Sequence, residues 1–420
     1  MVRLLYSLFL YFITPLIWLR LLWRARKQPA YLKHLGERYG FYSLAKPEKL
    51  IWVHAVSVGE TRAAQPLIEG LQAAWPDHKI LLTCMTPTGR ESGHEVYGDK
   101  LIQAYLPYDY PGAVGRFLKH FSPSFGVLME TEIWPNLLAG VQVAKVPVIL
   151  ANARLSARSA RGYDRLAALV CPAFEALSGV AAQTDEDAKR IRALGAKNVV
   201  VCGNLKFDVT PAAGKIALGQ SWRAALVDRP VFLAASTREG EEALILEAWQ
   251  KKNQQRNALL VIVPRHPQRF DTVAGLIQVA GLNLERRSQS LPDTETDVWL
   301  GDSMGEMAAY YSLADFAFIG GSLLPLGGQN LIEAAACGCP VLIGPHTFNF
   351  LQATEDAIKF GAAQRIETAA ALIEMADCFL SDSAALGTMQ SAAKSFGKAH
   401  QGATQRILGV IEQSSVRVVH

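Results

Sequence analysis

Several loops in the second half of the chain carry residue types that bind phosphate. Pro264-Arg265-His266-Pro267 follows an apolar run and places a guanidinium beside an imidazole. An arginine can hold a phosphate through two parallel hydrogen bonds. The stretch from Ser236 to Glu241 offers hydroxyls and backbone amides at the expected start of a helix, which also suits an anion. Both segments therefore predict anion binding.

Two glycine-rich stretches follow strands in the same half, residues 301–307 and 320–333. Glycine lets the backbone approach a ligand closely, and Asn330 and Glu333 stand three apart on the opening turn of a helix, where they can bind sugar or nucleotide hydroxyls. One such loop is most often only a turn or a cap. Four in one half favour a ligand site. GxGxxG after a first strand and GxxxxGK[ST] are both absent, which disfavours a dehydrogenase and a P-loop kinase.

The first half carries a single carboxylate, Glu60, where a strand turns into a helix. Residues 50–56 are apolar, whereas Ala64, Leu67, Ile68 and Leu71 recur at helical spacing. Ligands of open α/β sheets bind beyond the carboxyl ends of the strands, which is where Glu60 is expected. Alternatively, Glu60 only complements the positive end of a helix dipole.

Alternating strands and helices predict an α/β fold with parallel, doubly wound sheets. We expect one series of strands at 50–56, 79–85, 101–106, 125–129, 146–151, 179–182 and 198–202. We expect a second series at 231–235, 259–263, 298–300, 316–319 and 340–343. The polar stretch 203–214 is interpreted as the linker, so two Rossmann-like domains facing each other across a cleft are predicted. The stretch 389–413 is expected to be helical and to pack back across the domain junction.

Composition limits the class of protein. The 420 residues are 50% hydrophobic and 19% charged, with a net charge of +4, which suits two folded domains with some membrane contact. No zinc-finger spacing or RNA-binding signature supports a nucleic-acid partner. The six cysteines show no metal-ligand spacing, so we expect free thiols, no disulfide and no structural metal.

The N-terminal segment is predicted to bind a membrane. Residues 4–19 are almost wholly apolar, and Arg20, Arg24, Arg26 and Lys27 follow them. The run lacks a small-residue cleavage site and is marginal for crossing a hydrocarbon core of about 30 Å. A single span and a shallow insertion into one leaflet are both open. The basic cluster places the body of the protein on the cytoplasmic face.

Seven motifs, in order along the chain, resemble those of the 3-deoxy-D-manno-octulosonic acid (Kdo) transferases of lipopolysaccharide synthesis. They are Ser57-Val-Gly-Glu60, Glu130-Thr-Glu-Ile-Trp-Pro135, Asn152-Ala-Arg-Leu-Ser-Ala-Arg-Ser159, Gly203-Asn-Leu-Lys-Phe-Asp208, Pro264-Arg-His-Pro267, Gly305-Glu-Met307 and Gly328-Gln-Asn-Leu-Ile-Glu333. The resemblance implies an inverting, metal-independent glycosyltransferase of the GT-B architecture. It would move Kdo from CMP-Kdo to a lipid A precursor at the cytoplasmic face of the inner membrane, and would need no cofactor.

The resemblance also divides the chain. It implies a membrane anchor over residues 1–27, an acceptor-binding Rossmann-like domain over 28–205 and a CMP-Kdo-binding domain over 206–400, with a C-terminal helix over 401–420. Anionic inner-membrane lipid is a further expected partner, through the basic residues near the N-terminus.

Individual residues take roles from the same resemblance. Glu60 matches the general base, and Glu130 and Lys206 match residues that stabilise the transition state. The CMP-binding residues would be Arg265, His266, Gly305, Glu306, Met307, Asn330, Leu331, Ile332 and Glu333.

The contacts made by some residues stay open at this level. Arg90, Arg154 and Arg158 would bind the acceptor's phosphates or simply face anionic lipid. Gln329 stands where other members carry His, so its contact is not predicted. If Glu60 is not the base, Glu130 or Glu132 is the next candidate. Rival functions are a UDP-sugar transferase or epimerase of similar fold, and a non-catalytic membrane scaffold that binds a nucleotide.

Overall fold

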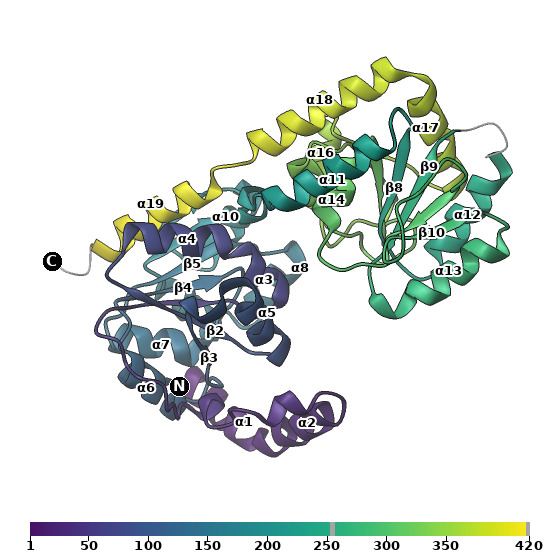
Figure 1. The fold of residues 1–420 in the computed structure, drawn as a ribbon. Helices are drawn as coiled ribbons and strands as arrows, with labels where there is room; N and C mark the ends of the chain where they lie inside the picture. The colour runs from purple at the N-terminus through teal and green to yellow at the C-terminus, as the bar shows by residue number, and fades with distance from the viewer. Residues whose placement is uncertain (253–256, 417–420) are drawn as a thin grey trace. The chain divides into compact units, whose positions relative to one another are not determined.

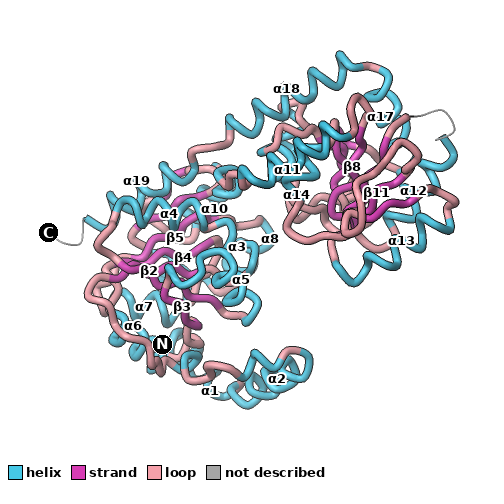
Figure 2. Tube along the Cα trace, in the orientation of Figure 1, coloured by secondary structure: helices cyan, strands magenta, loops and turns pink. Residues whose placement is uncertain are grey.

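The chain folds into two compact units in the computed structural model, which describes residues 1–252 and 257–416. The first unit comprises Met1–Val209 and the chain from Gln401 on, and the second comprises Thr210–His400. Each unit is built around its own parallel sheet, which Figure 2 shows flanked by helices. The predicted α/β class with parallel sheets is confirmed.

The sheet of the first unit has seven strands in the order β3-β2-β1-β4-β5-β6-β7. Its strands are β1 (Leu50–His54), β2 (Lys79–Cys84), β3 (Ile102–Tyr105), β4 (Phe125–Met129), β5 (Val148–Ala153), β6 (Gly179–Ala182) and β7 (Val199–Val201). The central strands β1, β4 and β5 are buried along their whole length. A parallel strand covered on both faces is apolar throughout, which is why these strands are read from continuous apolar runs.

Helices cover both faces of this sheet. They are α3 (Val58–Ala63), α4 (Gln65–Ala74), α5 (Pro87–Tyr97), α6 (Pro111–Phe121), α7 (Pro135–Val143), α8 (Ala157–Asp164), α9 (Ala167–Glu175), α10 (Asp185–Ala193) and α19 (Ala403–Val416). Trp52 of β1 packs on one face with Phe117 of α6 and Leu138 of α7. Ile51 packs on the other face with Leu67 of α4, in a cluster that also includes residues of α19.

The N-terminal segment forms two helices, α1 (Val2–Phe12) and α2 (Thr14–Lys27), drawn in purple in Figure 1. Their axes differ by 49°. No single helix among the described residues is long and apolar enough to cross a membrane, whereas this bent pair meets the requirement by length and composition. The pair also contacts the first unit: Tyr6 donates to Asp109 (3.1 Å), Ser7 donates to Asn136 (3.1 Å), and the rings of Trp18 and Tyr39 stack.

The second unit has a seven-stranded sheet in the order β10-β11-β9-β8-β12-β13-β14. Its strands are β8 (Val231–Thr237), β9 (Leu259–Pro264), β10 (Leu284–Arg286), β11 (Val298–Leu300), β12 (Phe316–Ile319), β13 (Val341–Ile343) and β14 (Ala363–Arg365). Its helices are α11 (Ala213–Ala225), α12 (Glu241–Lys252), α13 (Phe270–Val279), α14 (Met307–Leu313), α15 (Ile332–Ala336), α16 (Leu351–Lys359), α17 (Ala369–Ser381) and α18 (Ser383–Ala399).

Short 3₁₀ helices connect several of these elements. In the first unit they are η1 (Pro29–Leu32), η2 (Glu37–Tyr39), η3 (Gly98–Lys100) and η4 (Leu205–Asp208), and in the second η6 (Pro267–Arg269). The predicted helical stretch 389–413 is two helices, α18 and α19, which belong to different units. They separate at Gly402, whose φ of 89° a non-glycine residue rarely adopts.

Candidate active site

Three loops of the first unit leave the same edge of the sheet. Strands β1, β4 and β5 are neighbours, with His54 beside Leu128 and Met129 beside Ala151. Because the strands are parallel, the loops that begin after them emerge together. Glu60 lies in the helix that follows β1, Glu130 in the loop after β4, and Asn152 near the end of β5 itself. The fold therefore brings residues from three separate motifs to one place.

Glu60 lies in the first turn of α3, and its carboxylate is tied to the loop before the helix. Ser57 is the N-cap: its hydroxyl accepts from the Glu60 amide (3.3 Å) and donates to Glu60 Oε1 (2.8 Å). The Val56 amide donates to Glu60 Oε2 (2.9 Å). This is a variant of the capping box, in which a carboxylate near the helix start bonds back to an unpaired amide. Glu60 thus does contribute to capping.

The surroundings of Glu60 raise its affinity for a proton. Burial raises the pKa of Glu60 to about 7, and the negative charges of Glu130 and Glu132 act in the same direction. The bonds from Val56 and Ser57 lower it and only partly offset the burial. A carboxylate with a pKa near the working pH is well suited to take a proton, whereas a helix cap needs no such shift.

Glu130 and Lys206 form an ion pair at the same edge. Lys206 Nζ lies 3.5 Å from Glu130 Oε1, and the two side chains are 26% and 30% exposed. Glu130 has a positive φ of 57°, which is uncommon for a residue with a side chain. Such conformations persist where the surrounding structure holds them, and they gather at functional sites. The arrangement places a cation and a carboxylate within reach of solvent beside Glu60.

Lys206 owes its position to an asparagine far away in sequence. The Asn152 side chain, fully buried, accepts from the Leu205 amide (3.0 Å), while Asn204 accepts from the Lys206 amide (3.0 Å). Asp208 closes the same turn by accepting from Gly402 and Thr404 at the start of α19. Asn152 opens the motif Asn152–Ser159, but the motif alone assigns it no role.

The three arginines considered for the acceptor differ in their contacts. Arg90 is engaged inside the unit: its guanidinium pairs with Glu37 (2.7 Å) and donates to the Gln103 carbonyl (3.2 Å), so it is no surface residue. Arg154 and Arg158 are exposed, Arg154 just after β5 and Arg158 on α8. These two remain candidates to meet an acceptor phosphate.

The second unit gathers positive charge at the end of β9. Arg265 and His266 are exposed, and the Arg265 amide continues the sheet by donating to Thr237 (3.0 Å). Desolvation lowers the pKa of His266, and the nearby Arg238, Arg265 and Arg269 add to the effect. The imidazole is therefore neutral at pH 7, next to guanidinium groups that can bind a phosphate.

A buried carboxylate that sequence analysis did not single out holds the neighbouring glycine-rich loop. Glu241, at the first position of α12, is fully buried. Its two oxygens accept from the amides of Arg238 (2.9 Å), Gly321 (2.6 Å) and Leu323 (3.0 Å). Gly320 packs so tightly that a Cβ there would stand 2.4 Å from the Ser236 carbonyl oxygen. A glutamate after Ser-Thr-Arg-Glu-Gly was the available signal for this role.

The remaining residues predicted to bind CMP fall into two groups. Glu306 is held inside the unit by Ser303 (2.6 Å), Arg287 (3.3 Å) and Lys215 (3.6 Å), so it fixes the loop that contains Gly305, whose φ is 74°. The next residue, Met307, begins α14 and is half-buried.

The second group is the Asn330–Glu333 segment at the start of α15. Asn330 accepts from the Ile332 amide (3.1 Å) and donates to Glu333 (3.1 Å), and Glu333 is exposed. Leu331 and Ile332 are each 1% exposed, so their side chains belong to the core and only their backbone could meet a ligand. The Gln329 side chain packs beside Gly321, and the backbone amide of Gln329 donates to the Gly320 carbonyl (3.0 Å).

Solved structures share this fold. A glycosyltransferase from Rickettsia africae is 13% identical, with a TM-score of 0.60 over 89% of this chain and 99% of the other. A UDP-GlcNAc 2-epimerase from Neisseria meningitidis bound to UDP-GlcNAc is 16% identical, with a TM-score of 0.60 over 87% of this chain and 100% of the other. At such identities the likeness concerns the fold alone. It defines the class of protein: two α/β units, each on a parallel sheet.

The family follows from sequence relatives. Residues 33–209 match the family model described as 3-deoxy-D-manno-octulosonic-acid transferase (kdotransferase). A 3-deoxy-D-manno-octulosonic acid transferase from Bordetella pertussis is 45% identical over 97% of this chain and 98% of the relative. One from Haemophilus influenzae is 38% identical, covering 92% of each. The chain belongs to the Kdo transferase family of glycosyltransferases, which confirms the resemblance.

Proposed function

We propose that this protein transfers Kdo from CMP-Kdo to a lipid A precursor, with Glu60 as the general base. The observation that carries the proposal is the raised pKa of Glu60, about 7, at the sheet edge that also holds the Glu130–Lys206 pair. Membership of the Kdo transferase family supports the sugar. The nucleotide and the lipid acceptor rest on the motif resemblance.

The reaction requires removal of a proton, departure of CMP and stabilisation of charge on the sugar. Glu60 takes the proton of the acceptor hydroxyl, whose oxygen forms a bond to the anomeric carbon of Kdo. The bond from that carbon to the CMP phosphate oxygen breaks, and CMP leaves with the electron pair. Attack from the side opposite the leaving group inverts the configuration. The carboxylates of Glu60 and Glu130 bear negative charge where positive charge develops on the sugar, and Lys206 can offset the carboxylate of Kdo.

In this proposal the second unit holds the donor. Arg265, with neutral His266 beside it, binds the CMP phosphate. Asn330 and exposed Glu333 accept hydrogen bonds from ribose hydroxyls, while the backbone of Gly305 to Met307 and of Leu331 and Ile332 lines the nucleotide. Glu306 acts as a positioning residue through its contacts with Arg287 and Ser303. The first unit then holds the acceptor, with Arg154 and Arg158 near its phosphates.

The membrane attachment belongs to the same proposal. Helices α1 and α2 expose large apolar side chains, including Phe9 (57%), Phe12 (83%) and Leu16 (64%), and basic residues end α2. Apolar residues in an exposed row followed by Lys and Arg favour the cytoplasmic leaflet of an anionic membrane. We therefore place the protein on the cytoplasmic face of the inner membrane, where a lipid A precursor is reached directly.

The test is a transfer assay with the purified full chain in mixed micelles. CMP-Kdo and a lipid A precursor should give a product heavier by whole Kdo units, and mass spectrometry counts how many are added. A UDP-sugar should give none. Transfer should persist in EDTA, as the family resemblance implies. A chain that binds CMP but makes no product would favour the scaffold, and turnover of a UDP-sugar would favour the transferase or epimerase rival.

The donor site has its own test. Arg265→Ala removes a charge-assisted contact and should weaken CMP binding by about 1.5–3 kcal/mol, the cost of losing a hydrogen bond to a charged group. Isothermal titration measures it. Lys359→Ala, at the end of α16 in the same unit, is the matched control and should bind CMP as the parent does. Unchanged CMP affinity in Arg265→Ala would remove Arg265 from the donor site.

A further inference from the structure

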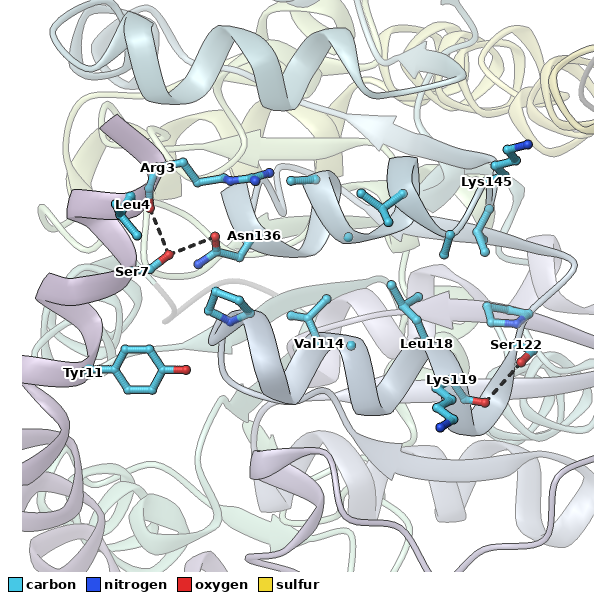
Figure 3. Close-up of a pocket in the computed structure, with 18 of the residues that line it drawn as sticks. Arg3, Leu4, Ser7, Tyr11, Val114, Leu118, Lys119, Ser122, Asn136 and Lys145 are labelled. Atoms are coloured by element: carbon cyan, nitrogen blue, oxygen red, sulfur yellow. Dashed lines mark hydrogen bonds between the residues drawn. The ribbon is translucent and has the colours of Figure 1, made fainter. Parts of the chain in front are cut away.

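A large groove lies on the first unit, and none of the candidate catalytic residues lines it. It has a volume of about 1000 Å³ and is bounded by α1, α6 and α7. That volume is at the upper end of the range of small-molecule sites in proteins. Figure 3 shows Val114 and Leu118 of α6 pointing into the space between α6 and α7, with α1 crossing at one end. The hydrogen bond from Ser7 to Asn136 fixes α1 in this place.

The groove is wide because its walls carry small residues. Gly115, Ala139, Gly140 and Ala144 line it, between the larger side chains of α6 and α7. A Cβ built on Gly115 would meet nothing within 4 Å, so the space above it is open. The lining also exposes large apolar groups: Val143 is 85% exposed, Leu4 63% and Leu8 55%. Exposed contiguous apolar surface of this kind marks an interaction site.

Charge at the rim has one sign. Arg3, Lys119 and Lys145 line the groove, and none of the described residues that line it is acidic. In Figure 3 Arg3 lies at the end where α1 crosses, whereas Lys119 and Lys145 lie at the opposite end. An apolar floor with a cationic rim matches a molecule that has a hydrocarbon chain and a negative head group.

The groove is continuous with the surface that we assign to the membrane. Leu4 and Leu8 belong to α1, and the same helix exposes Leu5, Phe9 and Phe12. A lipid could therefore enter the groove from the bilayer without crossing water. Glu60, Glu130 and Lys206 all lie outside the groove lining, so we treat the groove as a separate site, although α7 on one wall directly follows the loop of Glu130.

We propose that this groove holds one anionic glycerophospholipid, with an acyl chain on the α6–α7 floor and its phosphate paired with the rim cations. The lipid fastens the first unit to the membrane surface beside α1. It is a structural lipid of the bilayer rather than the acceptor that is glycosylated. The inference goes beyond the transfer reaction; it rests on the geometry of this groove and on the membrane attachment proposed above, but not on the transfer chemistry.

Native mass spectrometry of the full chain in detergent tests the proposal, with phosphatidylglycerol and phosphatidylcholine as probes. The parent should retain one phosphatidylglycerol, and it should release phosphatidylcholine more readily. Gly115→Phe fills the open space and should lower phosphatidylglycerol occupancy roughly ten-fold, equivalent to about 1.4 kcal/mol. Gly112→Phe is the matched control: it is exposed on the same helix but outside the groove lining, and should retain the lipid.

Two further measurements make the result decisive. Thermal unfolding must show that Gly115→Phe remains folded; if it does not, Lys119→Gln/Lys145→Gln replaces it, with Lys197→Gln as control, and should erase the preference for phosphatidylglycerol. Equal retention of both lipids by parent and groove variants would overturn the proposal. So would displacement of phosphatidylglycerol by a lipid A precursor at one-to-one stoichiometry, because the groove would then belong to the acceptor.

Discussion

At the scale of single residues, Glu60 combines two roles with opposite demands. Its carboxylate caps α3 through Ser57 and Val56, and those bonds favour the charged form. Burial and the nearby carboxylates favour the neutral form, and they prevail, since the pKa rises to about 7. If Glu60 served only to cap the helix, an ordinary pKa would stabilise the fold more, because the carboxylate would then be fully charged at neutral pH. The mismatch is what we expect of a group retained for proton transfer.

Replacing Glu60 with Gln separates these roles. The amide keeps the size and one acceptor oxygen but cannot take a proton, so turnover should fall by roughly 10²–10⁴-fold, as for other general bases. CMP affinity should stay the same, since the donor is assigned to the second unit. Single-turnover rates and CMP titration on one preparation measure both. If Kdo transfer continued within a few-fold of the parent rate, Glu60 would not be the base and Glu130 or Glu132 would be tested next.

The pH dependence gives a second prediction. Glu60 acts only when deprotonated, so kcat/KM should fall below about pH 7, roughly ten-fold per pH unit. The indole nitrogen of Trp134 donates a hydrogen bond to Glu132 Oε2 (2.6 Å). The negative charge of Glu132 raises the pKa of Glu60. Glu132→Gln should therefore move the acid limb to lower pH while leaving its slope unchanged. An acid limb that stays in place in this variant would show that Glu132 does not tune the base.

Stability should respond to pH with a definite sign. An acid whose pKa is higher in the folded than in the unfolded state loses stabilisation as pH rises from the unfolded value, near 4.5, to the folded one, about 7 for Glu60. The parent should lose stability over that interval through Glu60, and Glu60→Gln should not. Between pH 5 and pH 8, the thermal midpoint of Glu60→Gln should therefore rise relative to that of the parent.

At the scale of elements, most of the architecture is readable because parallel strands are buried on both faces. Continuous apolar runs such as Phe125–Met129 and Phe316–Ile319 predict strands with the observed bounds. The apolar pattern does not predict the edge strands β10 (Leu284–Arg286) and β14 (Ala363–Arg365), which contain Glu285, Gln364 and two arginines. These two strands are mostly half-buried and carry polar residues, so they lack the apolar signal that the edge strands β3 and β7 retain.

The site is less predictable than the strands, because its geometry depends on contacts between distant segments. The Asn152–Leu205 bond that places Lys206 joins residues 53 positions apart. Glu37 and Arg90 are also 53 positions apart, and their ion pair keeps the Arg90 side chain inside the unit. Periodicity and local motifs carry no information on such pairs. The resemblance supplied the residue names, whereas only the fold shows which side chains are tied up inside a unit.

Removing the hydrogen bond between Asn152 and Leu205 tests how Lys206 is positioned. Asn152→Gly tolerates the positive φ of 54° but leaves the Leu205 amide without its acceptor, at a cost of about 1–3 kcal/mol in stability. Turnover should fall because Lys206 loses its fixed position, with CMP affinity unchanged. Asn152→Asp keeps the acceptor oxygen and is the control that should retain the Lys206 geometry. Equal activity in both variants would show that this bond does not position Lys206.

At the scale of the whole molecule, the N-terminal helices belong both to the membrane surface and to the first unit. From the sequence, deleting residues 1–27 should release the protein from membranes at least partly and leave the two domains folded, because the strands begin at Leu50. The structure modifies that expectation. Tyr6 bonds to Asp109, Ser7 to Asn136, and Thr14 to Tyr110 (2.8 Å), while Leu21 is 7% exposed. Deletion therefore removes contacts as well as an anchor.

Two variants separate attachment from stability. Removing residues 1–27 should lower the thermal midpoint of the first unit, because each lost hydrogen bond contributes about 0.5–1.5 kcal/mol. Leu5→Gln/Phe9→Gln/Phe12→Gln changes only side chains that are 59%, 57% and 83% exposed, so the midpoint should stay close to that of the parent. Both should bind vesicles of anionic lipid more weakly, since burying each large apolar side chain contributes about 1.5–3 kcal/mol.

Vesicle flotation and thermal unfolding of the same preparations give the answer. Val279→Gln, 89% exposed at the end of α13 in the second unit, is the matched control and should float as the parent does. Some residual binding is expected in the truncated chain, because the basic residues after Lys27, such as Lys33, can still attract anionic lipid. If the triple variant floated as strongly as the parent, the exposed face of α1 would not be the surface that meets the membrane. If it unfolded at a lower temperature, those side chains would pack within the protein, and α1 would be an internal element of the first unit.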